Sequence, residues 1–140
     1  CKYFLDKGRS LGFATYGPQR EVVHADRSRR QLNQILEILA VVRSSGDFDL
    51  EHMLTMDTDY LGRGTTLILI TADQSERWIQ QAHILLRRGI RVVTVLMDPA
   101  SFGGMNSVHT AQARLASLNI PTYIVREGDN LTNVLSQRLN

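Results

Sequence analysis

Carboxylates and hydroxyls that follow apolar, strand-like runs are the residues of this chain best placed to do chemistry. They are Thr71, Asp73, Asp98, Ser101 and Glu127, which we call the rim residues. In open parallel sheets, ligands bind at the carboxyl ends of the strands, and oxygen ligands of this kind suit Mg²⁺ or Ca²⁺. The rim residues are therefore candidates for a metal or ligand site. An acidic residue after a strand also caps the following helix, and Asp73 is open to that second interpretation.

Other catalytic patterns are weaker. The histidines are scattered over different predicted elements without metal-ligand spacing, and a single cysteine, Cys1, allows neither an internal disulfide nor a cysteine-built zinc site. Ser101 lacks the flanking glycines of a nucleophile elbow, and we expect Gly103 and Gly104 beside it to give the loop flexibility. The glycine-rich segment 62–66 precedes a strand, whereas a phosphate loop follows one. No self-sufficient catalytic motif emerges.

Composition places the chain among ordinary soluble domains. It has 140 residues, of which 43% are hydrophobic and 21% charged, with a net charge of +2. No apolar run approaches the roughly 20 residues that span a bilayer. Aromatic residues make up only 6%, too few for the basic, aromatic-rich surface that nucleic-acid binding favours. We therefore expect one soluble domain that neither binds nucleic acid nor inserts into a membrane.

A helix tail, a Gly or Asn, and an apolar strand follow one another three times. Gly8, Gly89 and Asn119 tolerate the left-handed conformation that ends a helix, and short helix-to-strand returns build a mainly parallel sheet. The strands that follow them are 11–16, 92–97 and 122–125.

Two further strands complete the predicted sheet. Residues 20–25 return from the Gly17-Pro18 turn as an antiparallel edge strand, and 65–71 is an uninterrupted aliphatic run that we expect to be buried on both faces. Helices with apolar residues at three- and four-residue spacing lie between the strands. Their inward residues are expected to be Leu32, Ile35, Leu36 and Leu39; Trp78, Ala82, Leu85 and Leu86; Val108, Ala111, Leu115 and Leu118; and Leu131, Val134 and Leu135. The sequence thus predicts one three-layer α/β/α, Rossmann-like domain over residues 1–140, with a mainly parallel sheet and one antiparallel edge strand.

An ordered series of motifs resembles the C-terminal half of a bacterial family, domain-of-unknown-function family 58. The motifs are GRSLGFATYG at 8–17, QILEILA at 34–40, TLILIT at 66–71, Arg88-Gly89 before a strand, and IPTYIVREGD at 120–129. The resemblance implies a von Willebrand factor A-like fold and an association with MoxR-type AAA+ ATPases. Because members often carry N-terminal transmembrane helices, it also implies a cytoplasmic domain that a full-length parent could tether to the membrane.

The resemblance also implies where a metal would bind. In that fold an adhesion-type site takes Asp-x-Ser-x-Ser from the first strand, a Thr from a later loop and an Asp after the fourth strand. The first component is absent from this sequence, and the Thr position falls in 46–49, where Asp47 is the substitute oxygen donor. Asp73 stands one position away from the expected Asp. These departures argue against a working metal site, so we expect no cofactor and at most weak Mg²⁺ binding.

The chain starts within a helical segment, without a strand before it. We therefore expect the domain to be truncated at its N-terminus, with its first, central strand outside the sequence. The order across the sheet would then be 20–25, 11–16, the absent strand, 65–71, 92–97 and 122–125. We expect an upstream segment to fill the gap between 11–16 and 65–71, or two copies of the chain to pair through this gap as a homodimer. Direct closure between the flanking strands is the third, less favoured outcome.

Three functions remain open on the sequence. The leading hypothesis is a non-catalytic protein-interaction module that works with a MoxR-type AAA+ ATPase in complex assembly, as the resemblance implies. The alternative is a small metal-dependent α/β enzyme that uses Asp73, Asp98 and Glu127, although no base or nucleophile accompanies them. A purely structural domain, whose rim carboxylates are only helix caps, is the third.

Overall fold

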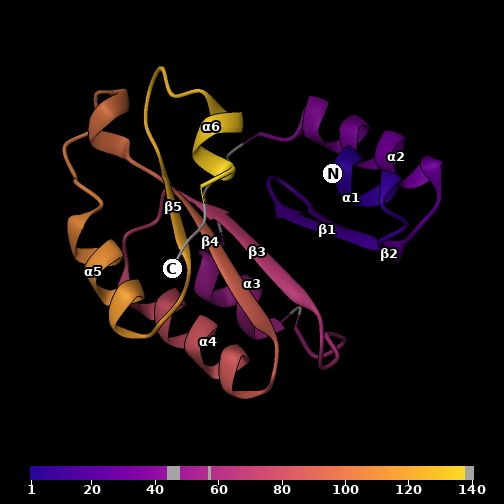
Figure 1. Ribbon diagram of the computed structural model, residues 1–140, viewed down its shortest axis with the longest axis horizontal. Coiled ribbons are helices and arrows are strands. Elements are labelled where there is room, and N and C mark those ends of the chain that lie inside the picture. Colours follow the sequence, from indigo (N-terminus) through magenta and orange to yellow (C-terminus); the bar gives the residue numbers. More distant parts are fainter. Residues whose placement is uncertain (44–47, 57, 138–140) are drawn as a thin grey trace. The chain divides into compact units, whose positions relative to one another are not determined.

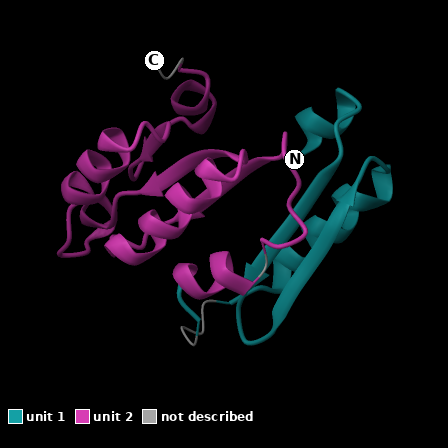
Figure 2. Cartoon of the chain, turned by 90° about the horizontal axis from the view of Figure 1, so that it is seen from below, with its two compact units in different colours: residues 1–49 teal, residues 50–140 magenta. Residues whose placement is uncertain are grey.

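The chain forms two compact units, each with its own sheet. The computed structural model describes residues 1–43, 48–56 and 58–137. Unit 1 is Cys1–Asp49 and unit 2 is Leu50–Asn140, shown in teal and magenta in Figure 2. Unit 1 holds a two-stranded sheet and unit 2 a three-stranded one. Within the described residues, no helix is both long enough and apolar enough to cross a membrane.

Unit 1 is built on a hairpin. The strands β1 (Leu11–Tyr16) and β2 (Arg20–Asp26) pair antiparallel, which confirms the hairpin predicted from the Gly17-Pro18 turn. A side chain at Gly17 would be obstructed, because a Cβ there would lie 2.7 Å from the carbonyl oxygen of Arg43. Glycine is therefore required at this turn by the close approach of another backbone segment.

A buried glutamine joins helix α2 (Arg29–Val41) to the hairpin. The Gln31 side chain donates to the carbonyl oxygens of Leu11 at 2.6 Å and His24 at 2.7 Å. These carbonyls belong to the two paired strands, so one amide group holds the helix against both. Such a group is stable in a buried position because its donors are satisfied.

The apolar face of α2 is covered only in part. Ile35 is fully buried, but Leu36 and Leu39 are about half exposed. The expectation that both leucines point inward is wrong for unit 1, because a two-stranded hairpin is too narrow to cover the whole stripe. The remaining helix, α1 (Lys2–Asp6), is short and contributes no buried residue.

The start of α2 carries a local hydrogen-bond cluster. The hydroxyl of Ser28 donates to one carboxylate oxygen of Asp26 at 2.7 Å, and the backbone N–H of Arg27 donates to the other. These hydrogen bonds hold the pKa of Asp26 below its ordinary value. The one from the Ser28 hydroxyl has the largest effect, and the one from the Arg27 N–H the next largest.

Unit 2 contains a parallel sheet whose strands follow sequence order (Figure 1). Its strands are β3 (Thr66–Thr71), β4 (Arg91–Met97) and β5 (Thr122–Val125). β3 pairs with β4, and β4 with β5, both in parallel. The predicted strands and their parallel pairing are confirmed, and so is the mixed α/β architecture.

One face of this sheet forms the core with α3 (Leu50–Met56), α4 (Glu76–Arg87) and α5 (His109–Ser117). Most residues predicted to face inward on α4 and α5 are buried, and Ile79 joins them. The buried cluster comprises Leu54, Leu69, Trp78, Ile79, Ala82, Leu85, Ile90, Val92, Leu96, Val108, Ala111, Leu115 and Ile120. Unit 2 therefore has a hydrophobic core of its own.

The opposite face of β3 is exposed. Leu69 is 5% exposed, whereas Ile68 is 43% and Ile70 is 70% exposed. The prediction that this strand is buried on both faces is therefore wrong. Helices α3, α4 and α5 contribute to the buried cluster on the Leu69 side of the sheet. The last helix, α6 (Leu131–Leu135), packs against β5, which is separated from β3 by β4.

Helix α6 itself is more exposed than predicted. Leu131 and Leu135 are about half exposed, although both were expected to face inward. Asn130 caps the helix by accepting a hydrogen bond from the backbone N–H of Asn133 at 3.2 Å. With only five residues, the helix contacts little more than the end of the strand before it.

The three helix-to-strand turns adopt the predicted conformation. Gly8, Gly89 and Asn119 have φ angles of 69°, 88° and 54°, all in the left-handed region. Each of the two sheets lies within one unit, so the direct closure of 11–16 onto 65–71, which would join the two units, stays a prediction. An upstream strand or a second copy beside β3 stays a prediction.

Candidate functional site

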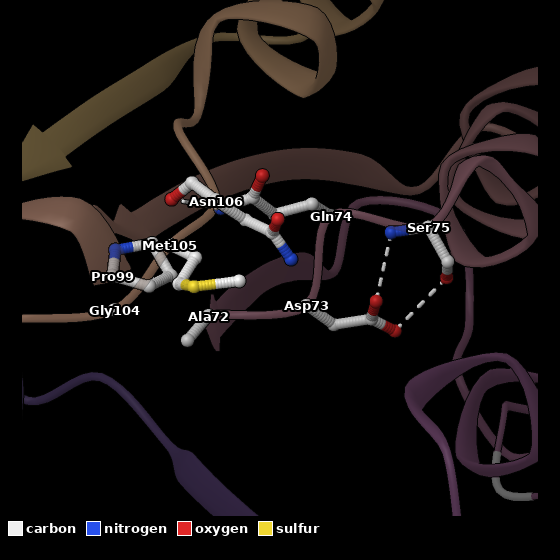
Figure 3. Close-up of a pocket in the computed structure, with 8 residues that line it drawn as sticks. All are labelled: Ala72, Asp73, Gln74, Ser75, Pro99, Gly104, Met105 and Asn106. Atoms are coloured by element: carbon white, nitrogen blue, oxygen red, sulfur yellow. Dashed lines mark hydrogen bonds between the residues drawn. The ribbon is translucent and has the colours of Figure 1, made fainter.

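An open cavity of about 610 Å³ lies at the carboxyl ends of β3 and β4. One wall is the loop 72–75 between β3 and α4 (Figure 3). The other comes from Pro99, the first residue of the short 3₁₀ helix η1 (Pro99–Phe102), and from 104–106, which lie between η1 and α5. Of the rim residues, only Asp73 lines this cavity.

The Asp73 carboxylate is engaged by its own loop. One oxygen accepts from the backbone N–H of Ser75 at 2.8 Å and the other from the Ser75 hydroxyl at 3.0 Å, as Figure 3 shows. The Asp73 carbonyl accepts from the indole N–H of Trp78, and its N–H donates to Thr71 Oγ1, both at 3.0 Å. Asp73 thus orders the turn that leads into α4. This role is similar to helix capping, which was the alternative to a metal or ligand site for this residue.

Asp98 is buried beside an arginine from the neighbouring strand end. Its Oδ2 lies 3.2 Å from Nε of Arg126, and its side chain is 10% exposed while that of Arg126 is 51% exposed. The guanidinium supplies the positive charge that a buried carboxylate requires. Its Oδ1 is also buried and accepts no hydrogen bond within the described structure.

Ser101 fastens η1 to the loop after β5. Its hydroxyl donates to the Asp98 carbonyl at 2.8 Å and accepts from the backbone N–H of Glu127 at 2.9 Å. Both hydrogen bonds are to the backbone, so the hydroxyl has no general base to activate it. Glu127 is an exposed residue, and this link engages its backbone N–H.

The rim residues therefore act in two separate groups. Thr71 and Asp73 order the β3–α4 loop, while Asp98, Ser101 and Glu127 belong to the link between η1 and β5. In the described part of the chain, no three His, Cys, Asp or Glu side chains are close enough to share a metal ion. Asp47, the other predicted metal ligand, lies outside the described residues.

Two glycines beside the cavity occupy positions that suit glycine, and the loop flexibility expected of them stays a prediction. Gly103 ends η1 with a left-handed φ of 85°. The Gly104 N–H donates to the Pro99 carbonyl at 2.8 Å, and a Cβ at Gly104 would lie 2.9 Å from that oxygen. Sequence reasoning placed the loop but missed that Gly104 forms a wall of the cavity. A Gly-Gly pair after a short helix was the available signal.

Two polar residues of the cavity were not considered from the sequence. The Gln74 side-chain amide lies 3.5 Å from the carbonyl oxygen of Asn106, across the opening between the two walls. Neither residue belongs to a catalytic pattern, so the sequence offered no signal for them. The cavity therefore presents side-chain amides, the Asp73 carboxylate that Ser75 already engages, and the exposed Met105.

Comparison with protein-family models, with curated proteins and with solved structures finds no match to this chain.

Proposed function

We propose that this chain is a non-catalytic protein-interaction module. The observation that carries the proposal is the engagement of the rim: Asp73 is held by Ser75, Asp98 by Arg126, and Ser101 by two backbone groups. Catalysis by these groups would need them to converge on one reacting atom, whereas each is held within one of two separate groups. Apolar side chains, by contrast, reach solvent on a helix of unit 1 and on a strand of unit 2, which suits contact with another protein.

We further propose that the two units belong to a von Willebrand factor A-like fold. Support comes from the parallel order β3-β4-β5 and from the antiparallel hairpin β1–β2, which are the two parts that the sequence resemblance requires.

The partner we propose is a MoxR-type AAA+ ATPase, acting with this module in the assembly of a larger complex at the cytoplasmic side of a membrane. The proposal rests on the resemblance of the five motifs to family 58. The experiment is to immobilise the purified chain and measure the binding of a purified MoxR-type ATPase from the same genome, with an unrelated AAA+ ATPase as the control. We expect saturable binding of the first alone, and a changed rate of ATP hydrolysis by the bound partner.

A rim variant separates this proposal from a catalytic one. Because Asp73 has a local structural role, Asp73→Asn should leave the affinity for the ATPase within twofold of that of the unchanged chain. Absence of saturable binding, or the same affinity for both ATPases, would contradict the proposed partner.

A small metal-dependent enzyme is the second candidate, favoured by one observation. The buried Oδ1 of Asp98 has no hydrogen-bond partner among the described residues, and a cation could satisfy it. The adjacent Arg126 guanidinium weighs against this, because it already supplies a positive charge and repels another. Titration with Mn²⁺, comparing the unchanged chain with Asp98→Asn, tests the candidate: a saturable site lost in the variant would favour it.

A further inference from the structure

Four exposed arginines gather at the amino end of the parallel sheet of unit 2. They are Arg63 in the turn before β3, Arg87 and Arg88 at the end of α4, and Arg91 at the start of β4. We call them the arginine patch. Figure 1 shows the end of α4 and the starts of β3 and β4 at the same end of the sheet. All four residues belong to unit 2.

Backbone hydrogen bonds hold the two turns that carry these arginines side by side. The N–H of Arg91 donates to the carbonyl of Thr65 at 3.0 Å, and the N–H of Gly64 to the carbonyl of Gly89 at 3.5 Å. The side chain of Arg63 lies over Gly89, since a Cβ at that position would be 3.4 Å from Cγ of Arg63. The arginines of the two turns are therefore kept close together on a hydrogen-bonded base.

The positive charge of the patch is almost unpaired. In the described part of the chain, no carboxylate forms an ion pair with Arg63, Arg87 or Arg91. Arg88 has only Asp59, at 4.0 Å, and the side chain of Asp59 is 90% exposed. An exposed pair at this distance contributes little, so the patch keeps its charge available for an anion.

Other arginines of unit 2 are paired. Arg77, at the start of α4, lies 3.6 Å from Glu51, and Arg126, after β5, lies 3.2 Å from Asp98. Both are away from the amino end of the sheet, and the carboxylates of the rim residues follow the carboxyl ends of the strands. Unit 2 therefore has a basic end and an acidic end.

The dipole of α4 accounts for part of the patch only. Cations are favoured in the last turn of a helix, which explains Arg87 and Arg88. Arg63 and Arg91 precede or begin strands, where no helix end attracts them. Placing these two beside the helix pair brings like charges together, and a bound anion would offset their repulsion.

We propose that the arginine patch binds an acidic segment of a partner protein, with its guanidinium groups donating to Asp or Glu carboxylates. This inference rests on the proposed function, because it names the surface that meets the partner and the chemistry of the partner's segment. Arginine suits this ligand, since its planar guanidinium can donate two parallel hydrogen bonds to one carboxylate. Residues 50–140 contain eight arginines and no lysine.

Other polyanions fit the patch less well. Binding of nucleic acid favours aromatic side chains that stack on bases, and binding at a membrane surface favours apolar side chains that insert beside the basic ones. The two turns, 62–66 and 87–91, contain one aliphatic side chain and no aromatic one. That side chain is Ile90, which is only 2% exposed. The turns thus present charge without a surface for stacking or insertion.

The test measures the binding of a model acidic segment to the full chain. The probe is a short peptide of alternating glutamate and glycine that carries a neutral fluorophore, and the control peptide has glutamine in place of glutamate. Fluorescence anisotropy should show saturable binding of the glutamate peptide alone. The affinity should fall as salt is added, because exposed charges are screened.

Matched variants locate the binding surface. Arg91→Gln should weaken binding of the glutamate peptide at least about fivefold, because it removes a charge-assisted pair. Arg77→Gln makes the same change in net charge at a side chain that is 70% exposed, and should keep the affinity within about twofold. Far-ultraviolet circular dichroism shows whether both are folded. The double variant Arg63→Lys, Arg91→Lys keeps the charge and should also bind more weakly, because an ammonium group does not form the bidentate pair.

Four results would overturn the proposal. Absence of saturable binding would show that the patch takes no acidic segment. Equal weakening by Arg91→Gln and Arg77→Gln would show a response to net charge alone, and full affinity in the lysine variant would remove the role assigned to the guanidinium groups. Tighter binding to duplex DNA or to phosphatidylserine vesicles than to the peptide would assign the patch to another class of partner.

The same variants separate this inference from the proposed function. If the ATPase binds the chain and Arg91→Gln leaves that affinity unchanged, the interaction module stands and the arginine patch is not its docking surface. If the glutamate peptide binds through the patch and the ATPase does not bind, the patch stands and the proposed partner is wrong.

Discussion

The sharpest test of unit 2 compares two neighbouring residues of β3. Leu69 and Ile70 are isomeric aliphatic side chains in one strand, but Leu69 is 5% exposed and Ile70 is 70% exposed. Changing each to alanine removes the same number of carbon atoms from opposite faces of the sheet. The difference between their effects therefore measures how well each face is covered.

The magnitudes follow from burial. Leu69→Ala removes about three carbon groups from the core, worth about 2.4 kcal/mol at ~0.8 kcal/mol each. The cavity that remains raises the loss to about 3 kcal/mol, within the range for buried leucines. Ile70 is about one-third buried, so Ile70→Ala should cost less than about 1 kcal/mol. We expect the two losses in free energy of unfolding to differ by about 2 kcal/mol.

Urea denaturation followed by tryptophan fluorescence provides the assay. The chain has one tryptophan, and Trp78 lies fully buried in the core of unit 2, so the signal reports the unfolding of this unit. The measurement should be made at concentrations where light scattering shows a monomer, since pairing through β3 would stabilise both chains. Equal losses for the two variants would refute the reasoning, because they would mean that the Ile70 face is covered as completely as the Leu69 face.

Three further predictions concern the turns and the rim. Gly104→Ala should destabilise unit 2 by about 1–3 kcal/mol, because its Cβ would press on a backbone carbonyl oxygen. Gly62→Ala is the control, since a Cβ there meets no atom within 4 Å, and thermal melts of the two variants compare their stabilities. Ser28→Ala should raise the pKa of Asp26 toward its ordinary value, as an NMR titration of the carboxyl would show. The lowered pKa stabilises the fold above the pKa of the unfolded chain, and this contribution is lost as the pH falls through the folded value. Calorimetry should detect no specific Mg²⁺ site, and a tight site abolished by Asp73→Ala would contradict this.

Local backbone chemistry made the strands and their turns predictable. A left-handed residue after a helix is costly for most side chains, so Gly8, Gly89 and Asn119 mark the helix ends in the sequence itself. The strands they introduce begin within a residue or two of the predicted positions. These features depend on a few consecutive residues and not on the rest of the fold.

The exposure of β3 could not be read from the strand alone. An uninterrupted aliphatic run indicates that burying both faces of the strand would be favourable. It does not indicate whether other elements of the fold cover both faces. Ile68 and Ile70 carry the same signal as Leu69, and only the positions of the helices distinguish them. The same reason applies to Leu36 on α2, whose hairpin is too narrow to cover it.

The rim shows how neighbours decide what a carboxylate does. Parallel topology alone predicts that Asp73 and Asp98 follow adjacent strands, and the structure has them there. Their partners come from different distances along the chain: Ser75 is two residues from Asp73, whereas Arg126 reaches Asp98 from the next strand. A serine after an aspartate is visible in the sequence as a turn signal, but the arginine pairing depends on β4 lying beside β5. Because each carboxylate is held by its own neighbour, removing one partner frees one carboxylate without assembling a site.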